Sequence, residues 1–177
     1  MTGPDPVITP EHYRATLGHF CSGITVVTAS GDDGPAGMTC QSFCSLSLDP
    51  PLILVCPGKG SSSWPRIAPV GSFAVNVLAE DQEELCRGFA AKGGDKFAGI
   101  GWSPGPITGS PVIAGSLAWI ECRLEVLHDA GTTSSPSAGC STCRPGRGGR
   151  CCFSGVGTGV STSKCGIAPG GEPLSVI

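Results

Sequence analysis

The spacing of apolar and polar positions predicts a chain built mostly from β-strands. Apolar, β-branched runs at 23–30 (GITVVTAS) and 72–79 (SFAVNVLA) predict two strands, and the alternating run at 115–131 predicts a longer one. Residues 38–58 predict two more strands with a sharp break at Pro50-Pro51. Short strands, glycine-rich turns such as GDDGPAG and the lack of any βαβ alternation favour an antiparallel barrel.

Two segments carry helical spacing instead. Residues 9–11 (TPE) are typical of a helix start, because a capping hydroxyl precedes a proline in the first turn and a carboxylate near the positive end of the helix dipole. The following apolar residues fall at i, i+4 and i+7 and predict a stripe in the core: Tyr13, Leu17 and Phe20. Residues 80–90 (EDQEELCRGFA) predict a short helix with acidic residues in its first turn.

Composition places these elements in one domain. A chain of 177 residues, 40% hydrophobic and 14% charged, is long enough for one sizeable core and too short for two. No apolar run reaches the length of a membrane span, and residues 1–10 lack a signal-peptide pattern, so we expect a cytoplasmic protein. Single cysteines among apolar residues predict buried, reduced thiols at Cys21, Cys40, Cys44, Cys56, Cys86 and Cys122.

The sequence lacks the motifs of several common metal, catalytic and nucleic-acid-binding sites. The three histidines (His12, His19 and His128) show neither metal-ligand spacing nor a paired carboxylate motif, so we expect no metal and no catalytic histidine among them. There is no nucleophile elbow and no GxGxxG fingerprint. The lack of a basic, aromatic patch argues against a nucleic-acid partner.

Three stretches carry more polar side chains than a plain barrel requires. The first, 37–51 (GMTCQSFCSLSLDPP), alternates hydroxyl and apolar residues, which suits the rim of a flat ligand or an ordinary half-exposed strand. The second, 57–66 (PGKGSSSWPR), could wrap a phosphate with backbone amides, hydroxyls and the charge of Lys59 or Arg66, or be a flexible turn. The third, 87–99 (RGFAAKGGDKFAG), could flank a cofactor with aromatics and lysines, or end a helix.

Taken in order, these stretches resemble the flavin reductase family with the split-barrel, flavin-binding fold. The resemblance covers about residues 11–131 and rests on HFCSGITVVTA, GMTCQSFCSLSLDPPLILVC, FAVNVLAEDQ, GFAAKGGDKFAG and GSPVIAGSLAWIECRLEVLHDAG. It implies a mainly β, antiparallel, Greek-key split barrel with a few short helices, assembled as a homodimer. The most similar members are reductase components of two-component monooxygenases, which pass a hydride from NADH or NADPH to FAD or FMN and release reduced flavin to an oxygenase.

The resemblance also implies a cofactor site but identifies no catalytic residue. Residues 39–47 would contact the isoalloxazine and ribityl parts of the flavin near the subunit interface, the loop 59–63 would take the phosphates, and 89–97 would complete the pocket. The cofactor-binding residues implied are Thr39, Cys40, Gln41, Ser42, Ser45, Ser47, Lys59, Ser61, Ser62, Ser63, Phe89, Lys96 and Phe97. In such a site the protein mainly orients two rings, while the redox chemistry belongs to the cofactors.

The chain departs from the family pattern after Gly131. Up to that residue 13 acidic residues stand against 7 basic ones, whereas 132–177 hold four basic residues, one acidic residue, five of the 11 cysteines and 10 of the 28 glycines. The family continues with a DH pair, a β-branched strand and a final strand near an RG.Y motif. Here Thr132-Thr133 replace the pair, and neither strand is found in the sequence.

A one-base displacement of the reading frame accounts for this departure. Back-translated into G/C-rich codons and read one base earlier, residues 132–143 give DHIIAVGRVLDL, and residues 150–166 permit VLLLRGRYGRLDLEVR. Codon choice supplies part of the agreement, but a single shift restores both motifs. We therefore predict a flavin reductase-like domain at 1–131 and a Gly/Ser/Cys-rich frameshift product outside the family at 132–177, with no role for any residue after Gly131.

Other interpretations of the tail and of the function stay open. The tail cysteines fit no standard zinc ribbon, and no histidine joins them: Cys140, Cys143, Cys151, Cys152 and Cys165. A disordered Gly/Ser-rich tail would describe how the residues behave but not why two family strands are missing. The alternatives to a reductase are a flavin-binding protein without turnover and an inactive frameshifted product.

Overall fold

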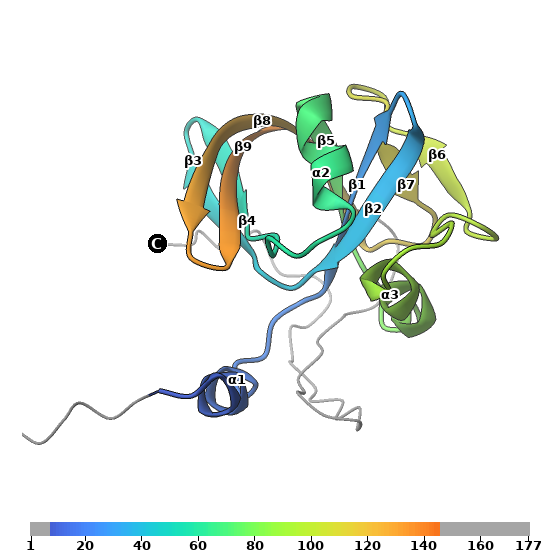
Figure 1. Ribbon diagram of the computed structural model, residues 1–177. Helices are drawn as coiled ribbons and strands as arrows, with labels where there is room; N and C mark the ends of the chain where they lie inside the picture. Colours follow the sequence, from blue (N-terminus) through green and yellow to red (C-terminus); the bar gives the residue numbers. More distant parts are fainter. Residues whose placement is uncertain (1–7, 146–177) are drawn as a thin grey trace, which may run out of the picture. The chain divides into compact units, whose positions relative to one another are not determined.

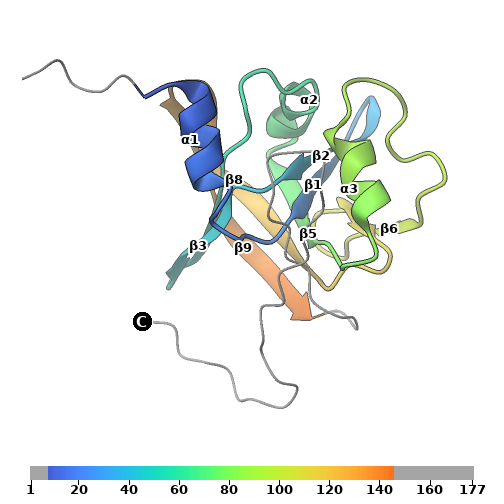
Figure 2. The same cartoon turned by 90° about the horizontal axis from the view of Figure 1, so that it is seen from below.

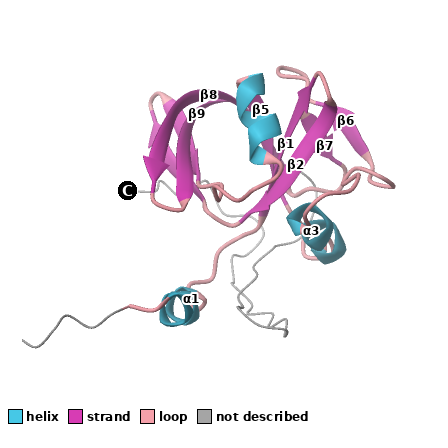
Figure 3. Cartoon of the chain, viewed as in Figure 1, coloured by secondary structure: helices cyan, strands magenta, loops and turns pink. Residues whose placement is uncertain are grey.

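The computed structural model describes residues 8–145, with side chains described as far as residue 132. The chain divides into two compact units, and residues 23–151 form the β unit, which holds all of the described strands. Strands are the main regular structure of the described chain and its helices are few and short (Figure 3). This confirms the predicted mainly β class.

Seven antiparallel strands form the main sheet, in the order β2-β1-β5-β8-β9-β4-β3. They are β1 (Thr25–Gly31), β2 (Gly34–Cys40), β3 (Phe43–Leu48), β4 (Pro51–Val55), β5 (Ser72–Val77), β8 (Ala118–Ala130) and β9 (Thr133–Pro145). A smaller sheet pairs β6 (Trp102–Pro104) with β7 (Pro111–Ile113). The helices of the β unit are α2 (Trp64–Ile67), the 3-10 turn η1 (Ala68–Val70) and α3 (Glu83–Ala90).

The barrel is split between its two outer strands. β2 and β3 lie at opposite ends of the sheet order although only Gln41 and Ser42 separate them in the chain. Two backbone hydrogen bonds hold this connection in place: Phe43 N–H donates to Gln41 O (2.9 Å), and Cys56 N–H donates to Ser42 O (3.1 Å). The polar stretch singled out in the sequence therefore bridges the opening of the barrel.

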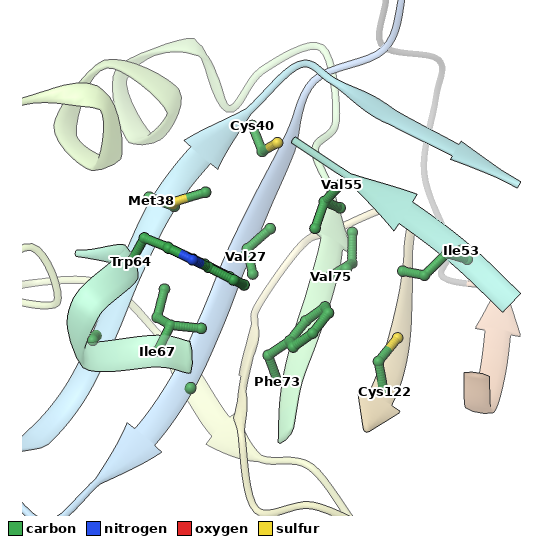
Figure 4. Close-up of a cluster of buried hydrophobic side chains, with 12 residues drawn as sticks. Val27, Met38, Cys40, Ile53, Val55, Trp64, Ile67, Phe73, Val75 and Cys122 are labelled. Atoms are coloured by element: carbon green, nitrogen blue, oxygen red, sulfur yellow. The ribbon is translucent and has the colours of Figure 1, made fainter. Parts of the chain in front are cut away.

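The core lies between β1, β2, β4, β5, β8 and α2 (Figure 4). Trp64 and Ile67 are the buried residues of α2, and the indole meets Phe73 edge to face at a centroid distance of 6.4 Å. Figure 1 shows α2 between the long, curved β8–β9 hairpin and the β1–β2 hairpin. Burial of these large side chains therefore fixes α2, and with it the serine-rich loop that leads into it.

A buried amide ties the small sheet to the main one. Asn76 on β5 donates to Val26 O (3.2 Å) and to Pro111 O (3.3 Å), and its carbonyl accepts from Ile113 N–H (2.9 Å). Its side chain is fully buried, so these partners replace the water that it loses on folding. β7 is held against β1 and β5 in this way.

The structure corrects two predictions of strand boundaries. The hairpin between β1 and β2 turns on Asp32 and Asp33 alone, so it is tighter than the predicted loop. The strand expected before Pro50 is two strands, β2 and β3, which pair with different neighbours. The predicted break at the prolines is present, with a cis peptide bond between Asp49 and Pro50.

The expectation that no strand follows Gly131 is wrong. β9 pairs with β8 from Ala130↔Thr133 to Ala118↔Pro145 and pairs on its other side with β4. Gly131 has a φ of 56°, a conformation that favours glycine and turns the chain straight back along β8. Backbone hydrogen bonds do not depend on side-chain type, so a strand without valine, isoleucine or leucine can still complete a ladder.

The N-terminal helix α1 (Pro10–Leu17) begins where it was predicted, with the Thr9 hydroxyl accepting from His12 N–H. The apolar stripe is not core, since Tyr13 is 58% exposed, Leu17 51% and Phe20 75%. Helical periodicity identifies a stripe but not what covers it, and α1 belongs to the other compact unit. The prediction of a core stripe is therefore wrong.

The six cysteines predicted to be buried divide into three groups. Cys40 and Cys122 are buried, and Cys56 and Cys86 are half-buried. Cys21 and Cys44 are exposed, against the prediction. Cys44 lies on the outer strand β3. Its neighbours in the sequence are apolar, but its side chain is exposed.

Candidate functional site

Two clefts meet on the β unit beside the split of the barrel. The first, here called the Thr39 cleft, has a volume of about 440 Å3 and is lined by 38–42, 56–58, 60–62, 89–92, Ile24 and Lys96. The second, the Arg66 cleft, measures about 670 Å3 and is lined by Asp33, 35–37, Ser62, Ser63, Arg66, 93–97 and Trp102. Ser62 and Lys96 line both, so the two clefts adjoin each other.

The structure gathers most of the predicted cofactor residues here. Those that line the Thr39 cleft are Thr39, Cys40, Gln41, Ser42, Ser61, Ser62, Phe89 and Lys96. Ser63 and Phe97 line only the Arg66 cleft. Ser45, Ser47 and Lys59 line neither cleft, because the first two lie along β3 and the third turns toward β8.

Lys59 braces the β8–β9 turn. Its ammonium forms an ion pair with Asp129 at the end of β8, and its backbone N–H donates to Thr132 O (2.9 Å). The sequence places Lys59 among glycines and serines, but it does not show that the β8–β9 turn contacts this lysine. Its charge is therefore partly satisfied within the chain.

The serines of the loop before α2 are not equivalent. The Ser61 hydroxyl accepts from the N–H groups of Ser63 (3.3 Å) and Trp64 (3.1 Å) and so shapes the turn. The Ser63 side chain is buried and bonded to Lys96 (3.1 Å). The Ser62 side chain is exposed, and its hydroxyl has no hydrogen-bond partner among the described residues. Ser62 therefore keeps a donor for a ligand at the junction of the clefts.

Lys96 places a fixed positive charge at the same junction. Its ammonium donates to Phe89 O (2.8 Å), Ser63 Oγ (3.1 Å) and Gly37 O (3.4 Å). In the described part of the chain no carboxylate pairs with it, so its partners are all neutral and leave its charge uncompensated. Burial lowers the pKa of this lysine, as expected for an ammonium partly removed from water.

Thr39 and the Cys40 thiol form the inner wall of the Thr39 cleft. The Thr39 hydroxyl donates to Cys86 O (2.6 Å), which fixes α3 against β2. Burial raises the pKa of the Cys40 thiol, while its hydrogen bonds with the backbone of Cys56 and Ser42 act against that rise. Cys40 therefore presents a neutral, weakly polar surface to the cleft.

Phe89 packs closely against the backbone of β2 at Gly37. Its ring is fully buried, and a Cβ at Gly37 would lie 2.5 Å from a ring carbon, so the close packing requires glycine there. The ring meets Phe97 edge to face at 5.1 Å, and Phe97 meets Trp102 at 5.8 Å. α3, which contributes Phe89 to this row, lies beside β1 and β2 (Figure 2).

Several lining residues were missed. Met38, Cys56 and Lys92 line the Thr39 cleft, and Trp102 lines the Arg66 cleft. The sequence did contain a signal for Lys92 as a lining residue, because the stretch 87–99 also holds two phenylalanines and a second lysine. Trp102 had none, because it lies on β6, a short strand that the pattern of the sequence did not reveal.

The described part shows neither a cluster of metal ligands nor a membrane-spanning helix. Across residues 8–132, where side chains are described, no three His, Cys, Asp or Glu residues come together as a metal site. The cysteines of the zinc alternative lie outside that range. None of the described helices has the length and apolar composition needed to cross a bilayer.

Comparison with known proteins gives these clefts a context. Residues 17–135 match the family model of the flavin reductase like domain. The chain is 52% identical over 124 residues to the reductase subunit HsaB of a flavin-dependent monooxygenase from Rhodococcus jostii, covering 70% of this chain and 63% of that protein. It is 44% identical over 125 residues to a flavin reductase of Pseudomonas putida, covering 70% and 73%.

Solved structures agree with the sequence comparison. Nitrilotriacetate monooxygenase component B from Mycobacterium thermoresistibile superposes with a TM-score of 0.73 at 43% identity, covering 76% of this chain and 75% of that one. The NADH:FAD oxidoreductase of Streptomyces globisporus gives 0.73 at 36% identity, covering 81% and 89%. The predicted split-barrel fold is confirmed.

Proposed function

The chain belongs to the flavin reductase-like family, and from that premise we propose that it is an NAD(P)H:flavin oxidoreductase that supplies reduced flavin to a partner monooxygenase. The observation that carries the proposal is the junction at Ser62 and Lys96, where an unpaired hydroxyl and an uncompensated ammonium adjoin a cleft beside the barrel split. Those groups suit the phosphate of a flavin nucleotide.

The residues present fit such a cofactor. Residues 39–42 and 56–58 would hold the flavin ring, with the neutral Cys40 thiol and Met38 offering apolar contact. Ser62 and Lys96 would hold the phosphate. A bound flavin supplies the acceptor for a hydride from the nicotinamide, and the task of this chain is to orient the two rings and limit their motion.

A homodimer belongs to the same proposal. The outer strand β3 exposes two large apolar residues, Leu46 (52%) and Leu48 (82%). An edge strand with exposed leucines is suited to pairing with another surface. A second copy of the chain over β3 would cover them and would bring Ser45 and Ser47 to the edge of the Thr39 cleft of one protomer or its partner. A cytoplasmic location likewise stays a prediction.

Flavin binding and NADH oxidation by the purified chain test the proposal. We expect FMN or FAD to bind and NADH absorbance to decline only when flavin is present. Ser62→Ala should weaken flavin nucleotides about 5- to 20-fold, and riboflavin, which lacks the phosphate, by less than twofold. Arg87→Met, which removes a cation on α3 outside both clefts, serves as the matched control. Lack of binding by any flavin would contradict the proposal.

A flavin-binding protein without turnover is the second candidate. It is favoured by the end of the family match at residue 135 and by the absence of the Asp-His pair from positions 132 and 133. Flavin binding without any NADH oxidation would select it. We also propose that 132–177 is translated out of frame, which an intact mass of the native protein and resequencing across the Gly131 codon would test.

A further inference from the structure

Two cysteines of the Thr39 cleft lie where they can react with each other. Cys40 ends β2, Cys56 directly follows β4, and both line the cleft. Cys40 is only 4% exposed, whereas Cys56 is half-buried and is therefore the more accessible thiol. Thiols that share a cleft can be oxidised as a pair, provided that their sulfur atoms can meet.

One backbone atom brings the two residues together. The carbonyl oxygen of Ser42 accepts from Cys56 N–H (3.1 Å) and from the Cys40 thiol (3.6 Å). The Cys40 thiol also hydrogen-bonds with the backbone of Cys56. In Figure 4 the Cys40 side chain points into the cluster that contains Val55, the residue before Cys56. A rotation about the Cα–Cβ bond of Cys56 is therefore enough to bring its sulfur toward that of Cys40.

The electrostatics of Cys40 indicate the same closeness. Burial raises the pKa of the Cys40 thiol, and negative charge on the sulfur of Cys56 raises it further. Water would screen such an effect between distant, exposed groups. Cys40 therefore keeps its proton while Cys56 reacts, which divides the roles of the pair. Cys44, by contrast, is exposed on β3 and lines neither cleft.

We propose that Cys40 and Cys56 form a modification site for hydrogen peroxide, at which oxidation joins them in a disulfide that narrows the Thr39 cleft. The thiolate of Cys56 attacks one peroxide oxygen, the O–O bond breaks, and the departing hydroxide takes up the former thiol proton and leaves as water. Cys56 is then a sulfenic acid. The sulfur of Cys40 attacks it, an S–S bond forms, the S–O bond breaks, and the hydroxyl leaves with the Cys40 proton as a second water.

The oxidant follows from the proposed function. Reduced flavin that no oxygenase consumes reacts with dioxygen and yields hydrogen peroxide. The disulfide would tie 56–58 to 39–42, the two stretches that would hold the flavin ring. Oxidation would therefore slow the reductase when reduced flavin accumulates. This consequence rests on the proposed function, whereas the reaction of the two thiols does not.

Peptide mapping of the full chain tests the reaction. The chain is treated with hydrogen peroxide, alkylated, denatured and digested without reduction by endoproteinase Asp-N and chymotrypsin, whose cleavage at Asp49 and Phe43 separates Cys40, Cys44 and Cys56. We expect a disulfide between the Cys40 and Cys56 peptides, and dithiothreitol should remove it. Cys44→Ser, which changes an exposed thiol outside both clefts, should leave this disulfide unchanged.

Two results of the mapping would overturn the proposal. One is that no Cys40–Cys56 disulfide forms at any peroxide concentration that oxidises the chain. The other is that Cys56 proceeds to a sulfinic acid while Cys40 stays open to alkylation in the unfolded chain, since the second thiol would then not reach the first.

Flavin titration of the reduced and the oxidised chain tests the effect on the cleft. Oxidation should weaken FMN and FAD about 10-fold or more, and dithiothreitol should restore binding, which it does not do after oxidation of Met38 to a sulfoxide. In Cys40→Ala and in Cys56→Ala, peroxide should change the flavin affinity by less than about twofold. Thermal melts show whether each variant is folded, and either variant alone is sufficient.

The remaining outcomes separate the two proposals. An oxidised chain that binds flavin as tightly as the reduced chain, or a response to peroxide that both variants retain, would overturn the effect of the disulfide on the cleft. A reduced chain that binds no flavin would defeat the reductase proposal, and the mapped disulfide would still decide whether Cys40 and Cys56 react as a pair.

Discussion

β8 and β9 are neighbouring strands of 13 residues each, and they hold their places in the sheet by different means. β8 buries Cys122 and Glu121 completely and packs Ile120 and Leu124 against the core. β9 reads TSSPSAGCSTCRP and contains no valine, isoleucine, leucine or aromatic residue. It pairs by backbone with β8 over almost its whole length and with β4 over three residues.

The contrast shows what a hydrogen-bonded ladder can and cannot supply. A ladder satisfies backbone groups that would otherwise lie unpaired at the edge of β8, whatever the side chains are. Most of the net stability of a sheet comes instead from burial of side chains, about 25 cal/mol for each Å2 of apolar surface. β9 therefore completes the topology of the barrel with a sequence that offers little to its core.

The largest expected effect tests the contribution of β8. The buried carboxylate of Glu121 accepts from Thr108 N–H (2.7 Å), from the Thr108 hydroxyl (2.8 Å) and from Ile107 N–H (3.2 Å). Glu121→Ala leaves these donors unpaired and should lower the free energy of unfolding by about 3–5 kcal/mol in urea denaturation. Glu125→Ala, an exposed carboxylate on the same strand, is the control and should change stability by less than about 0.5 kcal/mol.

Replacing the sequence of β9 should strengthen the weaker strand. A variant carrying DHIIAVGRVLDL at 132–143 introduces isoleucine, valine and leucine where the present chain has none. Their burial should raise the free energy of unfolding by about 2–5 kcal/mol and reduce aggregation, because an apolar strand covers β4 and β8 better. Equal melting temperatures and equal light scattering for the two chains would contradict both this prediction and the frameshift proposal.

A polar substitution on β8 should cost less than loss of the carboxylate. Cys122 is fully buried in the core, where its thiol donates to Ile120 O (3.9 Å), and Cys122→Ser would replace the large apolar sulfur with a small polar hydroxyl, at a cost of about 1–3 kcal/mol. Cys44→Ser on the exposed strand β3 is the matched control and should be close to neutral. If the two substitutions cost the same in thermal denaturation, burial on β8 is not what distinguishes it from its neighbours.

The smallest effect concerns the turn that joins the two strands. The ion pair between Lys59 and Asp129 is exposed at both ends, with 43% and 78% of the side-chain surface accessible. Lys59→Ala should therefore cost less than about 1 kcal/mol, and 1 M salt should remove most of the difference between variant and parent. A larger loss, unaffected by salt, would show that the β8–β9 turn depends on this lysine in another way.

Sequence pattern found the strands that pack on the core and missed those held by pairing. Residues 72–79 were identified by their apolar run, which β5 buries almost completely. β6, β7 and β9 lack such a run: β6 and β7 pair as a local hairpin, and β9 pairs with the preceding strand β8 and with the distant strand β4. The thirteen predicted cofactor residues came from family resemblance, and the structure brings ten of them to two adjoining clefts.

The sequence by itself determined the antiparallel class, the start of α1, the family and the composition break after Gly131, because these depend on local periodicity and on short motifs. Only the tertiary structure decided that Ser61 serves its own turn while Ser62 keeps a free hydroxyl, and that Lys59 turns to Asp129. It also decided that Arg66 and Trp102 share a cleft and that the stripe of α1 is exposed. Apart from the local turn at Ser61, each of these depends on which groups meet across long sequence separations, and that is fixed by packing and hydrogen bonding in the folded chain.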